Sequence, residues 1–367
     1  MSTQAFAQIA MNTIPTTFSD SLPSYTAVGG TERLSSTGLS AVVLNRGGRQ
    51  QRYSLFDELG KSGFDYVLSM EGSASRYDLE ALSGDFPFVR FILLKEDVSP
   101  GEEINLAALE LSSPLFFVIW NDSRILRGGV AGRIAERLQN YTQGGESTFT
   151  YKRICTVPLI QNGRAETMPT LITPVLISEK PSTLSIKTIP SYPGSEGLQS
   201  LYPFDGVGIY DRERFVRLGG FDSSIKSFRW QLMDFGFRCS LWGEKIESTQ
   251  LVKIAYEGDI PQEDGTAESG FKRFSLKNLA PVFRGDYAHI PLRRFLWYWR
   301  KMGSGLTEAW KEFSAARLWV EINRYRFCSD ARTIVERWES LGALGGTETG
   351  AFVEAASESE TAQKEKG

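Results

Sequence analysis

The feature that most restricts the fold of this chain is a regular alternation of apolar and amphipathic segments between residues 41 and 123. Short apolar runs occur at 41–44, 65–69, 88–94 and 115–120, and stretches of helical spacing separate them at 54–61, 79–82 and 103–111. Strands that alternate with helices form βαβ units, which build a mainly parallel sheet with helices on both faces. We therefore expect an α/β fold for this part of the chain.

Polar turns follow three of the four apolar runs. They are Asn45-Arg46-Gly47-Gly48, Glu71-Gly72-Ser73 and Asn121-Asp122-Ser123. In open α/β sheets, ligands bind outside the carboxyl ends of the parallel strands. We therefore expect the three turns to converge on one crevice.

One histidine and three scattered cysteines exclude several kinds of site. His289 is the single histidine, so a zinc site with several histidines is impossible and a Ser-His-Asp triad would have to use it. Cys155, Cys239 and Cys328 lack the close spacing of metal ligands, which favours reduced thiols in a reducing compartment. The formal net charge of -3 gives no broad basic field, so we expect no nucleic-acid partner.

The two ends of the chain lack the periodicity of the part between them. Residues 1–35 are predicted to be a flexible arm, and residues 342–367 a disordered tail, because both are poor in large apolar residues. The start has no basic segment before an apolar core, and no stretch approaches the roughly 18 apolar residues that cross a bilayer. We therefore expect a cytoplasmic location.

The most specific pattern lies in residues 204–222, which read Phe-Asp-Gly-Val-Gly-Ile-Tyr-Asp-Arg-Glu-Arg-Phe and then Val-Arg-Leu-Gly-Gly-Phe-Asp. Residues 230–238 follow, with Asp234 four positions before Arg238. With Glu71-Gly72-Ser73, Asn105 and the apolar run at 115–120, this ordered set resembles glycosyltransferase family 2 of the GT-A superfamily. The resemblance covers residues 38–245, about half the chain.

The resemblance implies a fold and a domain plan. The fold is of the GT-A type, with a mainly parallel, Rossmann-like sheet flanked by helices in residues 36–285, and a C-terminal helical extension in residues 286–341. Residues 149–201 are rich in Thr, Ile, Val, Ser and Pro. We predict strand pieces and a long irregular loop there, with the insertion at 156–201 forming part of an acceptor wall.

The resemblance also implies glycosyl transfer from a UDP- or GDP-linked sugar to a glycan or lipid-linked acceptor, in surface polysaccharide or glycolipid synthesis. Family members usually employ a divalent ion, here Mg²⁺ or Mn²⁺, which hard oxygen ligands bind well. Asp122 is implied as a metal ligand, His289 as a further ligand and Asp234 as the general base. The residues implied for the nucleotide-sugar site are Asn45, Glu71, Asn105, Asn121 and Arg238.

Two motifs depart from the family pattern. The Asp-x-Asp position reads Asn121-Asp122-Ser123, which leaves one carboxylate where two are usual. The Glu-Asp pair that precedes the later aspartate reads Gln231-Leu232, so the usual base is missing. Asp234 then either takes the base role or pairs with Arg238 one helical turn later. Asp222 is expected to close a turn or to cap the following helix.

Residues 291–302 are rich in aromatic and basic side chains. Phe295, Tyr298, Trp299 and Met302 have the spacing of one helical face. This face either packs onto the core or lies on a membrane surface, with its tryptophans at the interface and arginines toward anionic lipid. The second alternative predicts peripheral contact with the inner face of a membrane.

Two other functions remain open from the sequence. The altered motifs also suit a catalytically degenerate GT-A protein that acts as a binding or scaffold component. A nucleotidyltransferase is the third alternative, because Asn45-Arg46-Gly47-Gly48-Arg49 weakly resembles a glycine-rich phosphate loop.

Overall fold

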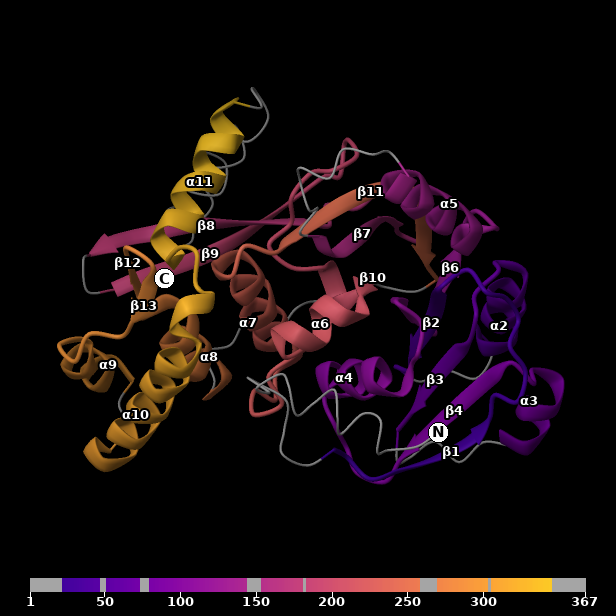
Figure 1. Ribbon diagram of the computed structural model, residues 1–367, viewed down its shortest axis with the longest axis horizontal. Helices are drawn as coiled ribbons and strands as arrows, with labels where there is room; N and C mark the ends of the chain where they lie inside the picture. The colour runs from indigo at the N-terminus through magenta and orange to yellow at the C-terminus, as the bar shows by residue number, and fades with distance from the viewer. Residues whose placement is uncertain are drawn as a thin grey trace, which may run out of the picture.

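A computed structural model describes residues 22–46, 51–72, 79–143, 153–180, 183–257, 269–302 and 305–344. Its centre is a nine-stranded sheet in the order β1-β4-β3-β2-β5-β10-β7-β11-β6 (Figure 1). The strands of this sheet are β1 (Tyr25–Gly29), β2 (Leu39–Leu44), β3 (Val67–Glu71), β4 (Val89–Leu94), β5 (Leu115–Trp120), β6 (Ser123–Ile125), β7 (Arg153–Gln161), β10 (Gly208–Asp211) and β11 (Lys245–Tyr256).

The strand directions confirm the predicted α/β fold with a mainly parallel sheet. Strands β4, β3, β2 and β5 are parallel neighbours, and β7 and β11 run in the same direction beyond the antiparallel strand β10. The other antiparallel strands, β1 and β6, lie at the two edges. Strand β1 falls within the segment predicted to be a flexible arm, and it is ordered there by backbone pairing with β4.

Helices cover both faces of the sheet, as the βαβ pattern predicts. The helices of this part are α2 (Gln51–Lys61), α3 (Leu79–Asp85), α4 (Pro100–Glu110), α5 (Val130–Gln143), α6 (Arg212–Leu218) and α7 (Phe228–Leu241). Helix α4 contacts α6 and α7 on one side of the sheet, and α2 and α3 lie on the other (Figure 1). The start of α4 is set by Pro100 and by a capping box between Ser99 and Glu102, which satisfies free backbone N–H groups.

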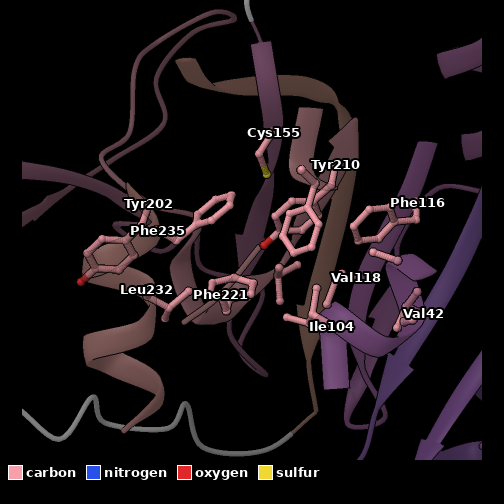
Figure 2. Packing of buried hydrophobic residues seen from close by; sticks show 14 of the residues in the cluster. Val42, Ile104, Phe116, Val118, Cys155, Tyr202, Tyr210, Phe221, Leu232 and Phe235 are labelled. Carbon is pink, nitrogen blue, oxygen red and sulfur yellow. The ribbon is translucent and has the colours of Figure 1, made fainter. Parts of the chain in front are cut away.

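The core forms where continuous apolar strands meet the helices. Every residue of β2 and of β3 is buried, as expected for strands covered on both faces. Figure 2 shows Val42, Phe116 and Val118 of the parallel strands beside Ile104 of α4. Leu232 packs in the same cluster near Phe221, so the position where family members have their usual base belongs to the hydrophobic core.

The region after β7 is more regular than predicted. Strands β8 (Leu171–Lys180) and β9 (Thr183–Ser191) form a separate antiparallel hairpin, where we had predicted strand pieces and a long irregular loop. Its β-branched residues favour strands, and a two-stranded sheet consists of edges alone. Because an edge tolerates a missing N–H donor, Pro174 and Pro190 can both pair within it.

A 3₁₀ turn η1 (Phe204–Gly206) precedes β10 and lies against the end of β5. The remaining elements lie at the other end of the molecule from β1–β4 (Figure 1). They are α8 (Ser269–Phe274), the π-helix η2 (Ser275–Leu279), β12 (Val282–Arg284), β13 (Tyr287–His289), α9 (Arg294–Met302), α10 (Leu306–Asn323), η3 (Arg324–Arg326) and α11 (Ala331–Leu344). Helix α10 contacts η2, and its Phe313 and Val320 belong to the same buried cluster as the sheet. The boundary between a GT-A domain and an extension therefore stays a prediction.

The predicted membrane-facing side of α9 packs onto the protein instead. Tyr298 is buried, and Phe295 contacts the rings of Trp310 and Phe313 on α10. The apolar spacing therefore reflects the packing of α9 against α10. Within the described residues, no helix has the length and apolar character needed to cross a bilayer. Residues 345–367 of the predicted tail lie outside the described residues.

Candidate functional site

Polar side chains at the ends of three parallel strands form one connected network, as the sequence predicts. Asn45 follows β2, Glu71 ends β3 and Asn121 follows β5. The Asn45 amide donates to Glu71 Oε2 at 3.1 Å, and the Asn121 amide donates to Asn45 Oδ1 at 2.9 Å. The chain reverses its strand order at β2, because β3 lies on one side of it and β5 on the other. A crevice at such a switch point is the usual ligand site of an open α/β sheet.

Glu71 is held from several sides. Arg52 lies 2.9 Å from Glu71 Oε2, and the Ser69 hydroxyl donates to Oε1 at 2.8 Å. Because its carboxylate is fully buried and already paired, Glu71 orders the turn in this arrangement, and its contact with a nucleotide stays a prediction. Gly47, Gly48 and Ser73, which the sequence places at the same edge, lie outside the described residues.

A second cluster lies beside this network and contains two residues that we did not predict as site residues, Arg46 and Asp205. Arg46 Nη2 donates to Asp205 Oδ2, and Arg46 Nε lies 3.7 Å from Asp122 Oδ2. The guanidinium carbon lies 3.8 Å from the ring centroid of Trp120. Arg46 is in turn tied to the first network, because its backbone N–H donates to the side-chain oxygen of Asn121.

Asp205 is placed by an unusual backbone conformation. Its φ angle is 54°, in the left-handed region that few residues other than glycine adopt. Trp120 Nε1 donates to the Asp205 carbonyl oxygen at 3.0 Å, and the Tyr256 hydroxyl donates to Asp205 Oδ2 at 2.7 Å. Burial raises the pKa of Asp205 to about 6, although the cation of Arg46 opposes that shift.

Another carboxyl group with a raised pKa lies on the first turn of α4. Burial, followed by the charge of Glu71, raises the pKa of Glu103 to about 8. Helix α4 begins after the carboxyl end of β4, so Glu103 approaches the same edge of the sheet as Glu71. Carboxyl groups with strongly shifted pKa values in a crevice are candidates for proton transfer or for binding a polar ligand.

Asp122 and His289 do not come together as a metal site. Asp122 follows β5, whereas His289 ends β13 at the far end of the molecule (Figure 1). Burial, followed by the charges of Arg284 and Arg294, lowers the pKa of His289. In the described part of the chain, no three His, Cys, Asp or Glu side chains are grouped so as to hold a metal ion. Strand β13 contacts α10 and η3, so this arrangement gives no support for a shared metal ion, and the ligand roles of Asp122 and His289 stay predictions.

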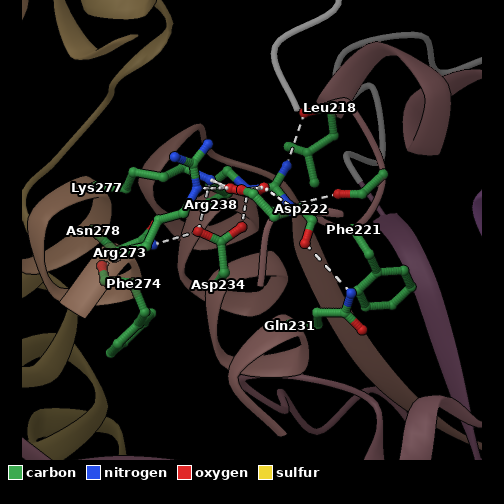
Figure 3. A network of polar contacts seen from close by, with 12 residues as sticks. Leu218, Phe221, Asp222, Gln231, Asp234, Arg238, Arg273, Phe274, Lys277 and Asn278 are labelled. Carbon is green, nitrogen blue, oxygen red and sulfur yellow. Dashed lines mark hydrogen bonds and ion pairs between the residues drawn. The ribbon is translucent and has the colours of Figure 1, made fainter. Parts of the chain in front are cut away.

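Asp234 belongs to a buried ionic network rather than to the crevice (Figure 3). It accepts from Arg238 Nε at 2.7 Å and from the Asn278 amide at 2.8 Å, and Lys277 Nζ lies 2.9 Å away. Burial disfavours the ionised form, but Lys277 and Arg238 together lower the pKa of Asp234. A fully enclosed and paired carboxylate cannot reach an acceptor hydroxyl, so the base role predicted for Asp234 would require this network to open.

Asp222 is the second acid of the same network. Lys277 Nζ lies 2.6 Å from Asp222 Oδ2, and Arg273 Nε lies 2.7 Å from the same oxygen. Asp222 also accepts from the backbone N–H of Ser224, so it does close the predicted turn. Although burial opposes ionisation, the two cations hold its pKa well below the usual range.

Arg238 and Asn105 both bind backbone groups in the structure. Arg238 donates to the carbonyl oxygens of Leu218 and Gly220. The Asn105 side chain donates to the Phe221 carbonyl and accepts from the Phe221 N–H, both at 2.8 Å. These contacts fix the Gly-Gly-Phe loop against α4 and α7, so a direct contact of either residue with a nucleotide sugar stays a prediction.

Comparisons with known proteins give similarity of fold. No protein-family model and no curated protein sequence matches the chain. The crystal structure of GalNAc-T7 with UDP, GalNAc and Mn²⁺ has 12% sequence identity and a TM-score of 0.47, and the match covers 76% of this chain and 55% of that one. The crystal structure of S. aureus TarS has 10% identity and a TM-score of 0.44, over 65% of this chain and 38% of that one.

A crystal structure of S. aureus TarS 1-349 in complex with UDP-GlcNAc also matches, with 10% identity and a TM-score of 0.42, over 76% of this chain and 71% of that one. This chain thus spans little more than half of the GalNAc-T7 chain and a smaller part of TarS. The nucleotides, sugar and metal in these descriptions belong to those proteins. They are GT-A glycosyltransferases, the superfamily that this sequence resembles.

Proposed function

We propose that this chain binds a nucleotide-diphosphate sugar at the carboxyl edge of β2, β3 and β5 and transfers the sugar to a glycan or lipid-linked acceptor. The observation that carries the proposal is the joined polar network at the switch point around β2. Its amide and guanidinium groups offer the donors and acceptors that a nucleotide requires. The ordered sequence motifs support the same function, in surface polysaccharide or glycolipid synthesis.

The reaction needs a base for the acceptor hydroxyl, and two carboxyl groups of the crevice suit that task better than Asp234. General bases work best when their pKa lies near the working pH. Asp205 and Glu103 have pKa values raised to about 6 and about 8. Of the two, Asp205 lies beside Asp122, which the family resemblance implies as a metal ligand, because Arg46 contacts both carboxylates.

The alternative function, a catalytically degenerate binding or scaffold protein, is favoured by a specific observation. The usual base position is Leu232 in the core, and the carboxylate of Asp234 is enclosed by cations. Such a protein would bind the nucleotide sugar and release it unchanged. Binding and turnover must therefore be measured separately.

The test is to incubate the purified chain with UDP- and GDP-linked sugars and to follow free nucleotide and sugar. Slow release of nucleotide from one donor is expected, because water can replace the acceptor. Asp205→Asn, which removes the proposed base, should abolish it, whereas Asp57→Asn, which alters an exposed acid of α2, should not. Donor binding without release, with every acceptor tried, would favour the degenerate protein. Absence of binding to all donors would refute the proposal.

We also propose that the outer side of α9 and α10 contacts an anionic lipid surface. Large apolar side chains are exposed in these helices or directly before α9, at Leu292, Leu296, Leu306, Trp310, Leu318 and Ile322. The exposed charges of the same stretch are mainly basic, which gives charge complementarity to anionic headgroups: Arg293, Arg300, Lys311 and Arg317 against Glu308 and Glu321.

Vesicle sedimentation tests this surface. The chain should sediment with vesicles of phosphatidylglycerol and phosphatidylcholine but not with phosphatidylcholine alone, and Leu318→Glu should reduce the bound fraction. Equal sedimentation of the variant, or none for the unaltered chain, would rule the surface out. Concentration-dependent dimerisation without lipid binding would instead assign it to a second copy of the chain.

A further inference from the structure

Arg46 occupies the space between the two carboxylates that a divalent ion would have to bind. Its guanidinium bonds to Asp205 and lies 3.7 Å from Asp122, while it stacks on Trp120 and lies 5.4 Å from the ring centroid of Tyr256. The cation of Arg46, on the chain after β2, is thus held by the end of β5 and the turn that follows it, by the 3₁₀ turn η1 and by the end of β11. An arginine has a fixed charge at any pH of interest.

The surrounding groups do not fit a metal ion. Asp205 Oδ2 already accepts from both Arg46 and Tyr256, so a metal bound at that oxygen would compete with two donors. Asp122 is the second carboxylate: its Oδ2 faces Arg46 and its Oδ1 is buried without a hydrogen-bond partner. Within the described ranges no third acidic, cysteine or histidine side chain completes a set of ligands. Divalent ions that prefer oxygen ligands usually rely on carboxylates left free for them.

We infer that Arg46 takes the place of the divalent ion, so that a nucleotide diphosphate binds in this crevice without a metal. The inference rests on the function proposed above and deepens it. Arg46 Nε is buried without a hydrogen-bond partner, so this donor is available to an acceptor that enters the site. A guanidinium binds phosphate oxygens through parallel N–H donors, and it supplies positive charge where the diphosphate leaving group develops negative charge. Arg46 would thereby exchange carboxylate contacts for phosphate contacts.

Calorimetric titration of the full chain with UDP, and separately with GDP, tests the inference. Each titration is done once in buffer with EDTA and once in buffer with Mn²⁺. The dissociation constant of the better nucleotide is expected to agree within about twofold between the two buffers. Arg46→Gln should weaken binding at least about tenfold in both, which corresponds to about 1.4 kcal/mol. Arg46→Lys keeps the charge but loses the planar donors, so its dissociation constant should lie between those of the unaltered chain and of Arg46→Gln.

The matched control is Arg33→Gln. Arg33 also pairs with an aspartate, Asp65, but at the amino end of β3 and therefore away from the crevice. The Arg33→Gln variant should bind nucleotide as the unaltered chain does. Thermal unfolding of each variant checks that the variant is folded. If Arg46→Gln does not fold, Arg46→Lys provides the test.

The outcomes separate this inference from the proposed function. Binding that requires Mn²⁺, or that Mn²⁺ tightens about tenfold or more, overturns the role of Arg46 and leaves the proposed function standing. Unchanged binding by Arg46→Gln in EDTA also overturns it. If neither nucleotide binds in either buffer, the donor site itself is refuted. Paramagnetic resonance of Mn²⁺ gives a further measurement: with the protein alone, the spectrum should remain that of the free ion.

Discussion

Replacing Lys277 with methionine should reveal how strongly the buried ionic network holds the C-terminal half together. Lys277 is 1% exposed, and its Nζ lies 2.6 Å from Asp222 Oδ2 and 2.9 Å from Asp234 Oδ1. The Coulomb attraction across two contacts of this length amounts to roughly 12 kcal/mol in total at an effective dielectric constant of about 20. Desolvation of the three charges offsets most of this, so we expect a net loss of about 3–5 kcal/mol in unfolding free energy at pH 7.

The pH dependence of that loss follows from the signs of the pKa shifts. The pKa values of Asp222 and Asp234 are lowered in the folded protein, so their stabilisation is present above their unfolded values, near 3.9, and is lost as pH falls through the folded values. Without Lys277 both folded pKa values rise. The destabilisation by Lys277→Met should therefore be largest near pH 7 and should shrink once the pH falls below the raised folded pKa values of the variant.

Urea unfolding followed by circular dichroism, at several pH values, measures this effect. The matched control is Lys61→Met, which removes a lysine that pairs with Asp57 on the exposed surface of α2 and should cost at most about 0.5 kcal/mol. A loss below about 1 kcal/mol for Lys277→Met at pH 7, or a loss that does not change with pH, would refute the reasoning. The network would then be held chiefly by its arginines.

Three further changes test the packing and electrostatics elsewhere. Glu103→Gln should raise the unfolding free energy by up to about 4 kcal/mol at pH 8, because the folded protein keeps this carboxyl largely protonated where the unfolded chain ionises it. The gain should vanish as the pH falls toward 4.5, and a constant gain in urea titrations would contradict this. Gly236→Ala should lower the unfolding free energy by at least about 2 kcal/mol, since a Cβ would lie 2.3 Å from the Leu201 carbonyl oxygen. Gly84→Ala, with open space around the added Cβ, should instead raise the melting temperature slightly. Similar thermal shifts for both variants would count against the structure of α7. Asn105→Ala should lower the unfolding free energy by about 1–3 kcal/mol, because it leaves the buried N–H and carbonyl groups of Phe221 unpaired. An unchanged denaturation midpoint would show that water replaces the side chain.

Much of the fold could be predicted from local patterns. The apolar runs and helical spacings of residues 41–120 depend on near neighbours in the chain, so β2 to β5 and the helices between them lie close to the predicted ranges. The meeting of Asn45, Glu71 and Asn121 could be predicted too, because parallel strands bring their carboxyl ends to one edge. Strand pieces were predicted in residues 149–201, but the pairing of β8 with β9 was missed, since prolines argue against paired strands unless the strands are edges.

The sequence by itself therefore determined the α/β class, the alternation of strands and helices along residues 41–123 and the edge at which polar turns gather, because periodicity and turn chemistry act over a few residues. Tertiary structure alone decided which charges meet. Lys277 and Asn278 enclose Asp234 from more than forty positions away, and Asp205, whose backbone adopts a left-handed conformation, meets Arg46 from a distant part of the chain. Whether a carboxylate acts as a base, a ligand or an internal ion pair depends on these distant neighbours, since burial and nearby charge set its pKa.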